Sequence, residues 1–268
     1  MKRYFYILVV IVMLMLLLMI FGSAYQNHSQ DYPNGNLIFK KETQTPTTNE
    51  VDISEEVNGN ITSDDTYKVS WIIARDKENI SLFSNTIERL TSNEALINNN
   101  CKYLVNAGFV DKSNNHIGLF RNHDGLINES SVNNTFNGFL FIDNNRNAYI
   151  SYLEPKSSLL ALQTGPLLIK NNSLINLTLL SDKNSRRVVA AVNRNKELVF
   201  IVFYSKSNPL GGPRLSELPS MLEDLENNTS LNITDAVNLD GGSHSVYISD
   251  QIKLPESSIV GGYFCIKW

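Results

Sequence analysis

The segment 240–245, near the C-terminus, combines a carboxylate with two glycines, two serines and an imidazole, in the order Asp240-Gly241-Gly242-Ser243-His244-Ser245. Because paired glycines lack Cβ atoms, their backbone can adopt positive φ and approach a ligand closely. The N–H groups of such a turn can bind an anion. This segment is therefore a candidate site for acid–base chemistry beside an anion, and the alternative is an ordinary Asp-Gly surface turn between two strands.

A second polar group interrupts the apolar run 160–169, in which Gln163 and Thr164 precede Gly165-Pro166. A Gly-Pro pair forces a turn and ends strand pairing. We therefore expect the Gln163 amide and the Thr164 hydroxyl at the end of a strand, where both can contact a ligand.

An arginine pair, Arg186 and Arg187, precedes the apolar run 188–192, which a polar turn separates from a second apolar run, 198–204. Two such runs predict a β-hairpin. The planar guanidinium group of arginine suits the geometry of phosphate, so an arginine at the start of a buried strand is a candidate phosphate ligand. The alternative for either arginine is a solvated loop cation.

Taken in chain order, these segments resemble the motifs of the phosphodiester glycosidase family, and the resemblance runs from about residue 68 to the C-terminus. The matching segments are Asn106-Ala107-Gly108-Phe109, His116-Ile117-Gly118-Leu119, Gln163-Thr164-Gly165-Pro166, Arg187 with its strand, and Leu239-Asp240-Gly241-Gly242. The resemblance implies hydrolysis of a sugar-1-phosphodiester, which releases the sugar and leaves a phosphomonoester.

The resemblance, together with residue chemistry, implies that Asp240, Arg187 and His244 are catalytic. Asp240 is expected on the sugar side as nucleophile or general base, two roles that the sequence does not distinguish. Arg187 and the N–H groups of Gly241 and Gly242 are expected to bind the phosphate. The other expected substrate-binding residues are Asn106, Gly108, Gln163, Thr164, Gly165, Ser243 and Ser245.

Asn106 and Gln163 are expected to orient sugar hydroxyls. Each of these assignments has a structural alternative: Asn106 as a turn cap, Gln163 as a partner of buried backbone groups, and Asp240 as the partner of a structural arginine.

The chain departs from the family pattern at three positions. His244 stands where the family has a serine, Val188 stands where a hydroxyl residue follows the arginine, and Val110 replaces a second aromatic. The expected function is therefore an extracytoplasmic hydrolase of a sugar-1-phosphodiester in a glycan, and the alternative is a catalytically silent glycan-binding ectodomain on a membrane stalk. A structural or partner-binding ectodomain is a third possibility.

The N-terminus predicts export. Lys2 and Arg3 precede the apolar run 4–21, which is close to the length of a membrane-spanning helix and places the N-terminus in the cytoplasm. We favour an uncleaved signal anchor over residues 1–24, and Gly22-Ser23-Ala24 leaves a cleaved signal peptide as the alternative. Residues 25–65 are polar and predict a disordered tether, so the remaining domain, 66–268, is expected outside the cytoplasm.

Apolar runs separated by turn signals predict one α+β domain, rich in strands, with a mixed sheet, several hairpins and few helices. Strands are expected at 69–74, 80–83, 103–105, 246–248 and 259–268, a further hairpin at 138–142 and 148–152, and helices at 86–98 and 215–225. Pro219 is tolerated only in a first turn, so the second helix is expected to start near Ser216.

Composition argues against several other functions. The net charge is −4 and no basic stripe is present, so we expect no nucleic-acid partner. The four histidines lack the spacing of zinc ligands, and we expect neither a metal nor a cofactor. His116 and His123 are expected in exposed loops. The only cysteines, Cys101 and Cys265, can form a disulfide in an oxidising compartment or remain free and buried, and the sequence leaves both open.

Overall fold

The computed structural model describes residues 53–59 and 66–267. The predicted signal anchor, 1–24, lies outside these residues, as does most of the predicted tether. No helix among the described residues is long and apolar enough to cross a membrane. One part of the predicted tether is corrected: Ile53–Gly59 forms strand β1, which pairs with Tyr67–Ala74.

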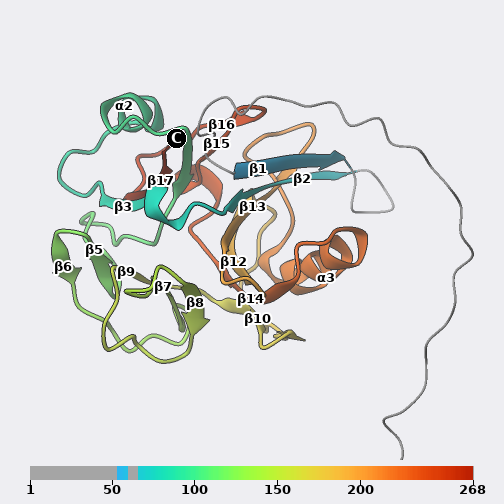
Figure 1. Cartoon of the computed structure of the whole chain (residues 1–268). Helices are drawn as coiled ribbons and strands as arrows, with labels where there is room; N and C mark the ends of the chain where they lie inside the picture. The colour runs from blue at the N-terminus through green and yellow to red at the C-terminus, as the bar shows by residue number, and fades with distance from the viewer. Residues whose placement is uncertain (1–52, 60–65, 268) are drawn as a thin grey trace, which may run out of the picture. The chain divides into compact units, whose positions relative to one another are not determined.

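The described residues form three β-sheets (Figure 1). The seven-stranded sheet has the order β1 (Ile53–Gly59), β2 (Tyr67–Ala74), β13 (Leu198–Ser205), β12 (Arg187–Asn193), β14 (Ile233–Asn238), β10 (Leu167–Lys170), β11 (Ser173–Leu174). One five-stranded sheet has the order β16 (Lys253–Leu254), β15 (Tyr247–Ile248), β4 (Tyr103–Asn106), β17 (Gly262–Ile266), β3 (Ile80–Ser84). The other has the order β6 (Gly125–Asn128), β5 (Phe120–Asn122), β9 (Leu160–Thr164), β7 (Gly138–Ile142), β8 (Ala148–Ser151).

The predicted α+β class agrees with this arrangement, but the predicted mixed sheet is wrong. Within the described residues, every pairing between named strands is antiparallel. The long helical connection through α3 (Leu218–Asn228) joins β13 to β14, and these strands lie on opposite sides of β12. In a βαβ unit, a helical connection joins two neighbouring parallel strands. Here the strands that it joins are separated by β12, so no parallel pair forms.

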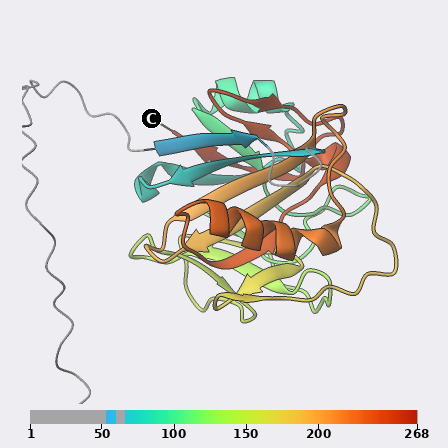
Figure 2. The same cartoon turned by 90° about the vertical axis from the view of Figure 1, so that its right-hand side faces the viewer.

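Alternating side chains of β12 and β13 supply two hydrophobic cores, because successive residues of a strand face opposite sides of the sheet. Val188, Ala190 and Phe200 belong to the core shared with the other sheets. Val189 and Ile201 belong to the core beneath α3. Figure 2 shows α3 lying across this second face of the sheet.

The two helical predictions are confirmed in part. The helix α2 is limited to Ser92–Asn98, because Thr91 and Glu94 form a capping box at its N-terminus. Arg89 has a φ of 53° just before it, a left-handed conformation that no α-helix accommodates. The second helix begins with a 3-10 turn, η2 (Leu215–Glu217), and continues as α3 with Pro219 in its first turn.

The Gly165-Pro166 pair ends one strand and begins another, as predicted. Its peptide bond is cis, and it separates β9 from β10, which belong to different sheets. A short connection thus joins two sheets and brings their ends to the end of β14, since Asn238 donates its backbone N–H to the Pro166 carbonyl at 3.0 Å.

Cys101 and Cys265 form a disulfide, with their Cα atoms 5.3 Å apart. Cys101 precedes β4 and Cys265 lies in β17, two strands that pair with each other. The disulfide therefore links neighbouring parts of one sheet, and it answers the question that the sequence left open.

Two short elements complete the described secondary structure: the 3-10 turns η1 (Lys77–Asn79) and η3 (Gly242–His244). The η3 turn follows directly after Asp240-Gly241, so the candidate carboxylate lies between the end of β14 and this turn.

Candidate active site

Asp240 lines two hollows of the surface. The first, which we call the Arg187 cavity, has a volume of about 400 Å³ and is lined by Arg187, Asp182, Lys183, Phe136, Gly165 and Pro166, among others. The second, the His244 cleft, has a volume of about 480 Å³ and is lined by His244, Arg89, Lys112, Asp111, Val110 and Ser258, among others. Asp240 and Phe109 line both. Asp240 therefore borders the space open to a ligand in either hollow.

Asp240 is half-buried, and its carboxylate accepts a 2.8 Å hydrogen bond from the Gly241 N–H. Burial raises the pKa of Asp240 to about 7, against the opposing effects of this hydrogen bond and of the Arg187 charge. Its main chain is fixed, because the Asn106 amide donates to the Asp240 carbonyl at 2.9 Å. A carboxyl group with a pKa near neutral pH is suited to proton transfer.

Arg187, the first residue of β12, faces the same cavity as Asp240. Its Nε donates to the Pro213 carbonyl at 3.2 Å, and its Nη2 donates to the Lys183 carbonyl at 2.6 Å and to Asp182 Oδ1 at 3.3 Å. Burial lowers the pKa of Arg187, and the neighbouring carboxylates, Asp182 first, oppose that shift. These contacts hold Nε and Nη2, and they leave Nη1 without a hydrogen-bond partner among the described residues.

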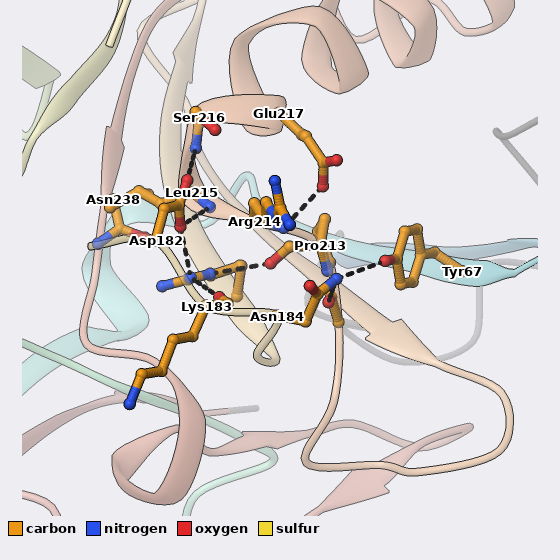
Figure 3. Close-up of polar contacts among 12 residues, drawn as sticks. Tyr67, Asp182, Lys183, Asn184, Pro213, Arg214, Leu215, Ser216, Glu217 and Asn238 are labelled. Carbon is orange, nitrogen blue, oxygen red and sulfur yellow. Dashed lines mark hydrogen bonds and ion pairs between the residues drawn. The ribbon is translucent and has the colours of Figure 1, made fainter. Parts of the chain in front are cut away.

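Asp182 connects Arg187 to the helical segment behind it. Its carboxylate accepts hydrogen bonds of 2.8 Å from the backbone N–H groups of Leu215 and Ser216, at the start of η2 (Figure 3). Burial alone would raise the pKa of Asp182, but the hydrogen bonds from Ser216 and Leu215 and the charge of Arg187 hold it below its usual value. Asp182 is therefore an ionised anchor for the guanidinium group.

Arg186 has a different role from its neighbour. It is 1% exposed, and its guanidinium donates to Ser245 Oγ at 2.7 Å and to the carbonyls of Ser245 and Pro255. Ser245 Oγ in turn donates to the Gly242 carbonyl at 2.6 Å. Arg186 therefore fixes the turn after Asp240 from inside the protein, and the predicted substrate contact of Ser245 is corrected to a structural one.

Gly241 and Gly242 use their N–H groups within the protein and do not offer them to a bound phosphate, which corrects a second prediction. The Gly241 N–H donates to Asp240 itself, and the Gly242 N–H donates to the Arg186 carbonyl at 2.9 Å. Gly242 has a φ of +62°, and a Cβ atom there would lie 2.7 Å from Ser185 Oγ. These glycines are needed for the close packing of the turn, and the predicted phosphate site reduces to the Arg187 side chain.

Asn106 also contacts backbone rather than the cavity. It is 1% exposed; its amide nitrogen donates to the Asp240 carbonyl, and its amide oxygen accepts from the Val246 N–H at 2.9 Å. The expected contact with a sugar hydroxyl is thus corrected: Asn106 positions the backbone of Asp240, which is close to the structural alternative of a turn cap.

Gln163 holds a loop that forms one wall of the cavity. Its Oε1 accepts from the N–H groups of Leu119 and Ser131, at 3.1 and 2.9 Å. Its Nε2 donates to the carbonyls of Ser131 and Phe136, at 2.6 and 2.9 Å. The amide is therefore fully used by main-chain groups, and the structural alternative for Gln163 replaces the expected sugar contact.

The remaining predicted residues fall into two groups. Thr164 is fully buried and donates to the Asn238 carbonyl at 2.8 Å, and Gly108 packs so closely that a Cβ atom would lie 2.8 Å from Leu162 Cδ1. These two are structural. Gly165 lines the Arg187 cavity, and His244 lines the other hollow, where its Nδ1 lies 3.1 Å from Ser243 Oγ.

His116 is not exposed as predicted. Its ring stacks on Phe120 with a centroid distance of 3.9 Å, and its Nε2 lies 2.8 Å from Ser84 Oγ. Burial lowers the pKa of His116 to about 4, so it is a neutral packing residue at ordinary pH.

Sequence reasoning missed several residues that line the two hollows: Asp182, Lys183, Phe136, Arg89 and Lys112. All lie in loops or turns, where no periodic pattern marks orientation. Phe109 and Phe136 illustrate the difficulty, because their rings meet at a centroid distance of 4.4 Å although they come from separate loops. Within the described residues, no group of three His, Cys, Asp or Glu side chains is arranged to hold a metal ion.

Known structures with this fold include an enzyme. The catalytic domain of zebrafish N-acetylglucosamine-1-phosphodiester alpha-N-acetylglucosaminidase, auto-inhibited by its pro-peptide, is similar with a TM-score of 0.63 and 13% identity, over 81% of this chain and 83% of that one. A hypothetical protein from Synechocystis is similar with a TM-score of 0.51 and 13% identity, over 80% of this chain and 62% of that one. At such identities the likeness shows the fold alone.

A search of curated protein sequences gives no match. The family model described as phosphodiester glycosidase matches residues 99–259, which is more than half of the chain. The match includes every segment that lines the two hollows except Arg89, and it contains Asp240, Arg187 and His244. The chain therefore belongs to the phosphodiester glycosidase family.

Proposed function

We propose that this protein hydrolyses a sugar-1-phosphodiester in a glycan outside the cytoplasm. One observation carries the proposal: a half-buried carboxyl group with a pKa of about 7, Asp240, and an anchored guanidinium group, Arg187, line the same cavity. The fold is shared with the zebrafish N-acetylglucosaminidase, and the family is one of glycosidases that act on phosphodiesters.

Arg187 is the phosphate ligand in this proposal. The contacts to Asp182, Lys183 and Pro213 use Nε and Nη2 of Arg187, so Nη1 remains to donate to a ligand. The planar guanidinium group matches the geometry of phosphate oxygens. Because Arg187 and Asp240 line the same cavity, a phosphate on Arg187 brings the anomeric carbon of its sugar close to the Asp240 carboxylate.

The bond between the anomeric carbon and the phosphate oxygen breaks, and its electron pair stays on the phosphate. The oxygen of water becomes bonded to the anomeric carbon, and one proton of that water is released to the phosphate or to solvent. Asp240 acts in its ionised form. As general base it takes the proton from the attacking water and then passes it to the phosphate or to solvent. As nucleophile it bonds to the anomeric carbon while the phosphate departs, and the water then displaces it from that carbon. Arg187 stabilises the departing phosphate, which needs little help from an acid.

The test is an assay of the full chain with a panel of sugar-1-phosphodiesters, beside two variants. Asp240→Asn should lower kcat by at least about a hundredfold, the usual size for loss of one key electrostatic group. Asp111→Asn is the matched control, because Asp111 lines the His244 cleft but accepts hydrogen bonds from its own turn, at Ser113 and Asn115. Full activity of Asp240→Asn would remove Asp240 from the mechanism.

The second candidate function is a glycan-binding ectodomain without catalysis. The departures from the family pattern favour it: Val188 is fully buried in the core, and His244 occupies the position of the family serine. In that case the protein should bind the same phosphodiesters in a calorimeter and release no sugar from any of them.

The proposed location rests on the chain's N-terminal sequence and on its cysteines. The apolar run 4–21 is suited to a membrane anchor, and the Cys101–Cys265 disulfide is typical of an oxidising compartment. Protease added to intact cells should digest the domain if it lies outside, while a cytoplasmic marker protein stays intact. Survival of the domain alongside the marker would contradict an external location.

A further inference from the structure

We propose that the substrate is an anionic sugar-phosphate polymer and that the enzyme cleaves it internally, holding charged units on both sides of the scissile bond. This inference rests on the proposed function and adds to it the class of substrate and the position of the cut.

The first step is that two separate hollows border the same carboxylate. The Arg187 cavity and the His244 cleft share Asp240 and Phe109 as lining residues, and their volumes are about 400 and 480 Å³. Each is large enough for a small ligand, since such sites span roughly 300–1,000 Å³. One hollow would be enough for an enzyme that removes a single terminal sugar. Here a second hollow shares Asp240 with the first.

The second step is charge. Lys183 adds an exposed cation to the Arg187 cavity, and in Figure 3 its side chain extends away from Asp182 and the contacts around it. Arg89 and Lys112, both exposed, line the His244 cleft. Cations thus line both of the hollows that Asp240 borders, in a chain whose net charge is −4.

Acidic groups offset these cations only in part. Besides Asp240, the carboxylates that line the two hollows are Asp182 and Asp111. Asp182 is paired with Arg187, and Asp111 accepts hydrogen bonds from Ser113 and Asn115 within its own turn. Lys183, Arg89 and Lys112 form no ion pair among the described residues, so they can bind anionic groups of a ligand.

The third step is the surface between the charges. Phe109 lines both hollows and packs against Phe136, each of them partly exposed. Aromatic rings pack well against apolar faces, and a sugar ring has such a face formed by its C–H groups. A sugar lying on Phe109 has Asp240 beside it, the phosphate at its anomeric carbon on the Arg187 side, and its remaining hydroxyls on the His244 side.

A phosphate attached to one of those hydroxyls is the group that Arg89 and Lys112 would bind. A ligand with one phosphate at Arg187 and another at Arg89 and Lys112 is a chain in which sugars alternate with phosphodiesters. Hydrolysis adds water across one internal bond between an anomeric carbon and a phosphate oxygen. One fragment gains a reducing sugar end, and the other gains a terminal phosphomonoester.

The experiment compares a monomeric sugar-1-phosphodiester with an oligomer of the same sugar and several phosphodiester repeats. The full chain should show a kcat/KM at least about tenfold higher for the oligomer, and early products should be fragments of intermediate length. Release of single sugars from one end, or an equal kcat/KM for both substrates, would overturn the proposal.

The variant that tests the charges is Arg89→Ala with Lys112→Ala. It should lower kcat/KM for the oligomer about tenfold more than for the monomer, and the preference for the oligomer should weaken as salt rises. Lys156→Ala is the control, because Lys156 is an exposed lysine that lines neither hollow. Equal losses on both substrates in the double variant would contradict binding of a second anionic unit.

A binding measurement separates this inference from the proposed function. Asp240→Asn, with and without the double substitution, is titrated with both compounds in a calorimeter. Suppose that the unsubstituted protein hydrolyses neither compound, but Asp240→Asn binds the oligomer about tenfold more tightly than the monomer and loses this advantage when Arg89 and Lys112 are also replaced. The proposed function then fails, and the anionic polymer remains as the ligand. Equal affinities for oligomer and monomer would overturn the inference on their own.

Discussion

The two hollows that Asp240 lines are built differently. In the Arg187 cavity, the guanidinium group is held by the Asp182 carboxylate and by two carbonyls, and Asp182 is itself fixed to the start of η2. In the His244 cleft, the cations are exposed side chains of turns, Arg89 and Lys112. Fixed groups are suited to stabilising charge that develops during a reaction, whereas exposed surface cations are suited to attracting a charged chain.

This difference assigns the reaction to the Arg187 cavity and the choice of substrate to the His244 cleft. Substitutions on the Arg187 side should reduce the rate for every substrate, because they disturb groups placed for the reaction. Substitutions on the His244 side should change which substrates react. The predictions below test that division, beginning with the largest expected effect.

Arg187→Gln should lower kcat about a hundredfold to a thousandfold, because it removes the cation that stabilises the departing phosphate. Arg187→Lys should recover only part of the rate, since an ammonium group cannot reproduce the planar fork. Steady-state kinetics on a monomeric phosphodiester measure both. A loss of less than about threefold in Arg187→Gln would shift the phosphate site away from this residue.

The rate should fall with acid because Asp240 acts in its ionised form. Its pKa is raised to about 7, so kcat/KM should be nearly constant above pH 8 and about a hundredfold lower at pH 5. Since the Arg187 charge lowers the pKa of Asp240, the midpoint should move to higher pH in Arg187→Gln. A rate that rises as the pH falls below 7 would instead indicate that Asp240 acts as an acid.

Asp182→Asn should lower kcat/KM about tenfold, because the neutral amide still lies near η2 but no longer attracts Arg187. Asp182 is a positioning residue, so the test needs a measurement that distinguishes lost positioning of Arg187 from lost stability of the fold. Binding of inorganic phosphate, measured by calorimetry, should weaken in this variant while the unfolding temperature falls by only a few degrees. Unchanged phosphate binding would separate Asp182 from the function of Arg187.

His244→Ser should have the smallest effect and change kcat/KM by no more than about tenfold in either direction. His244 lines the cleft to which we assign the choice of substrate. A gain in rate on the monomeric substrate would indicate that the histidine weakens a serine site, and a loss would indicate that the histidine is used. A loss above about a hundredfold would contradict the division between the two hollows.

Local patterns predicted most strands correctly. The hairpin of β12 and β13 and that of β7 and β8 follow from apolar runs separated by polar turns, since such patterns depend only on near neighbours. Strand β1 was missed because Ile53–Gly59 contains two glutamates and an asparagine. It is an edge strand with one partner, and edge strands carry polar residues that resemble those of a loop.

Side-chain roles were harder to predict than strands. Arg186 and Arg187 are adjacent and chemically identical, yet one is enclosed and fixes a turn while the other lines the cavity. Asn106 and Gln163 were expected to contact the sugar, but their amides contact backbone that comes from distant segments, 119–136 and 240–246. A sequence shows the donor and acceptor groups of a residue, and only the fold shows which partners reach them.

The central claim is that water attacks the sugar carbon beside Asp240 while the phosphate departs toward Arg187. Hydrolysis in water enriched in oxygen-18, followed by mass spectrometry of both products, tests it directly. The account predicts that the heavy oxygen appears in the released sugar and none appears in the phosphomonoester. Heavy oxygen in the phosphate product would show cleavage between phosphorus and oxygen, and it would contradict the assignment of Asp240 to the sugar.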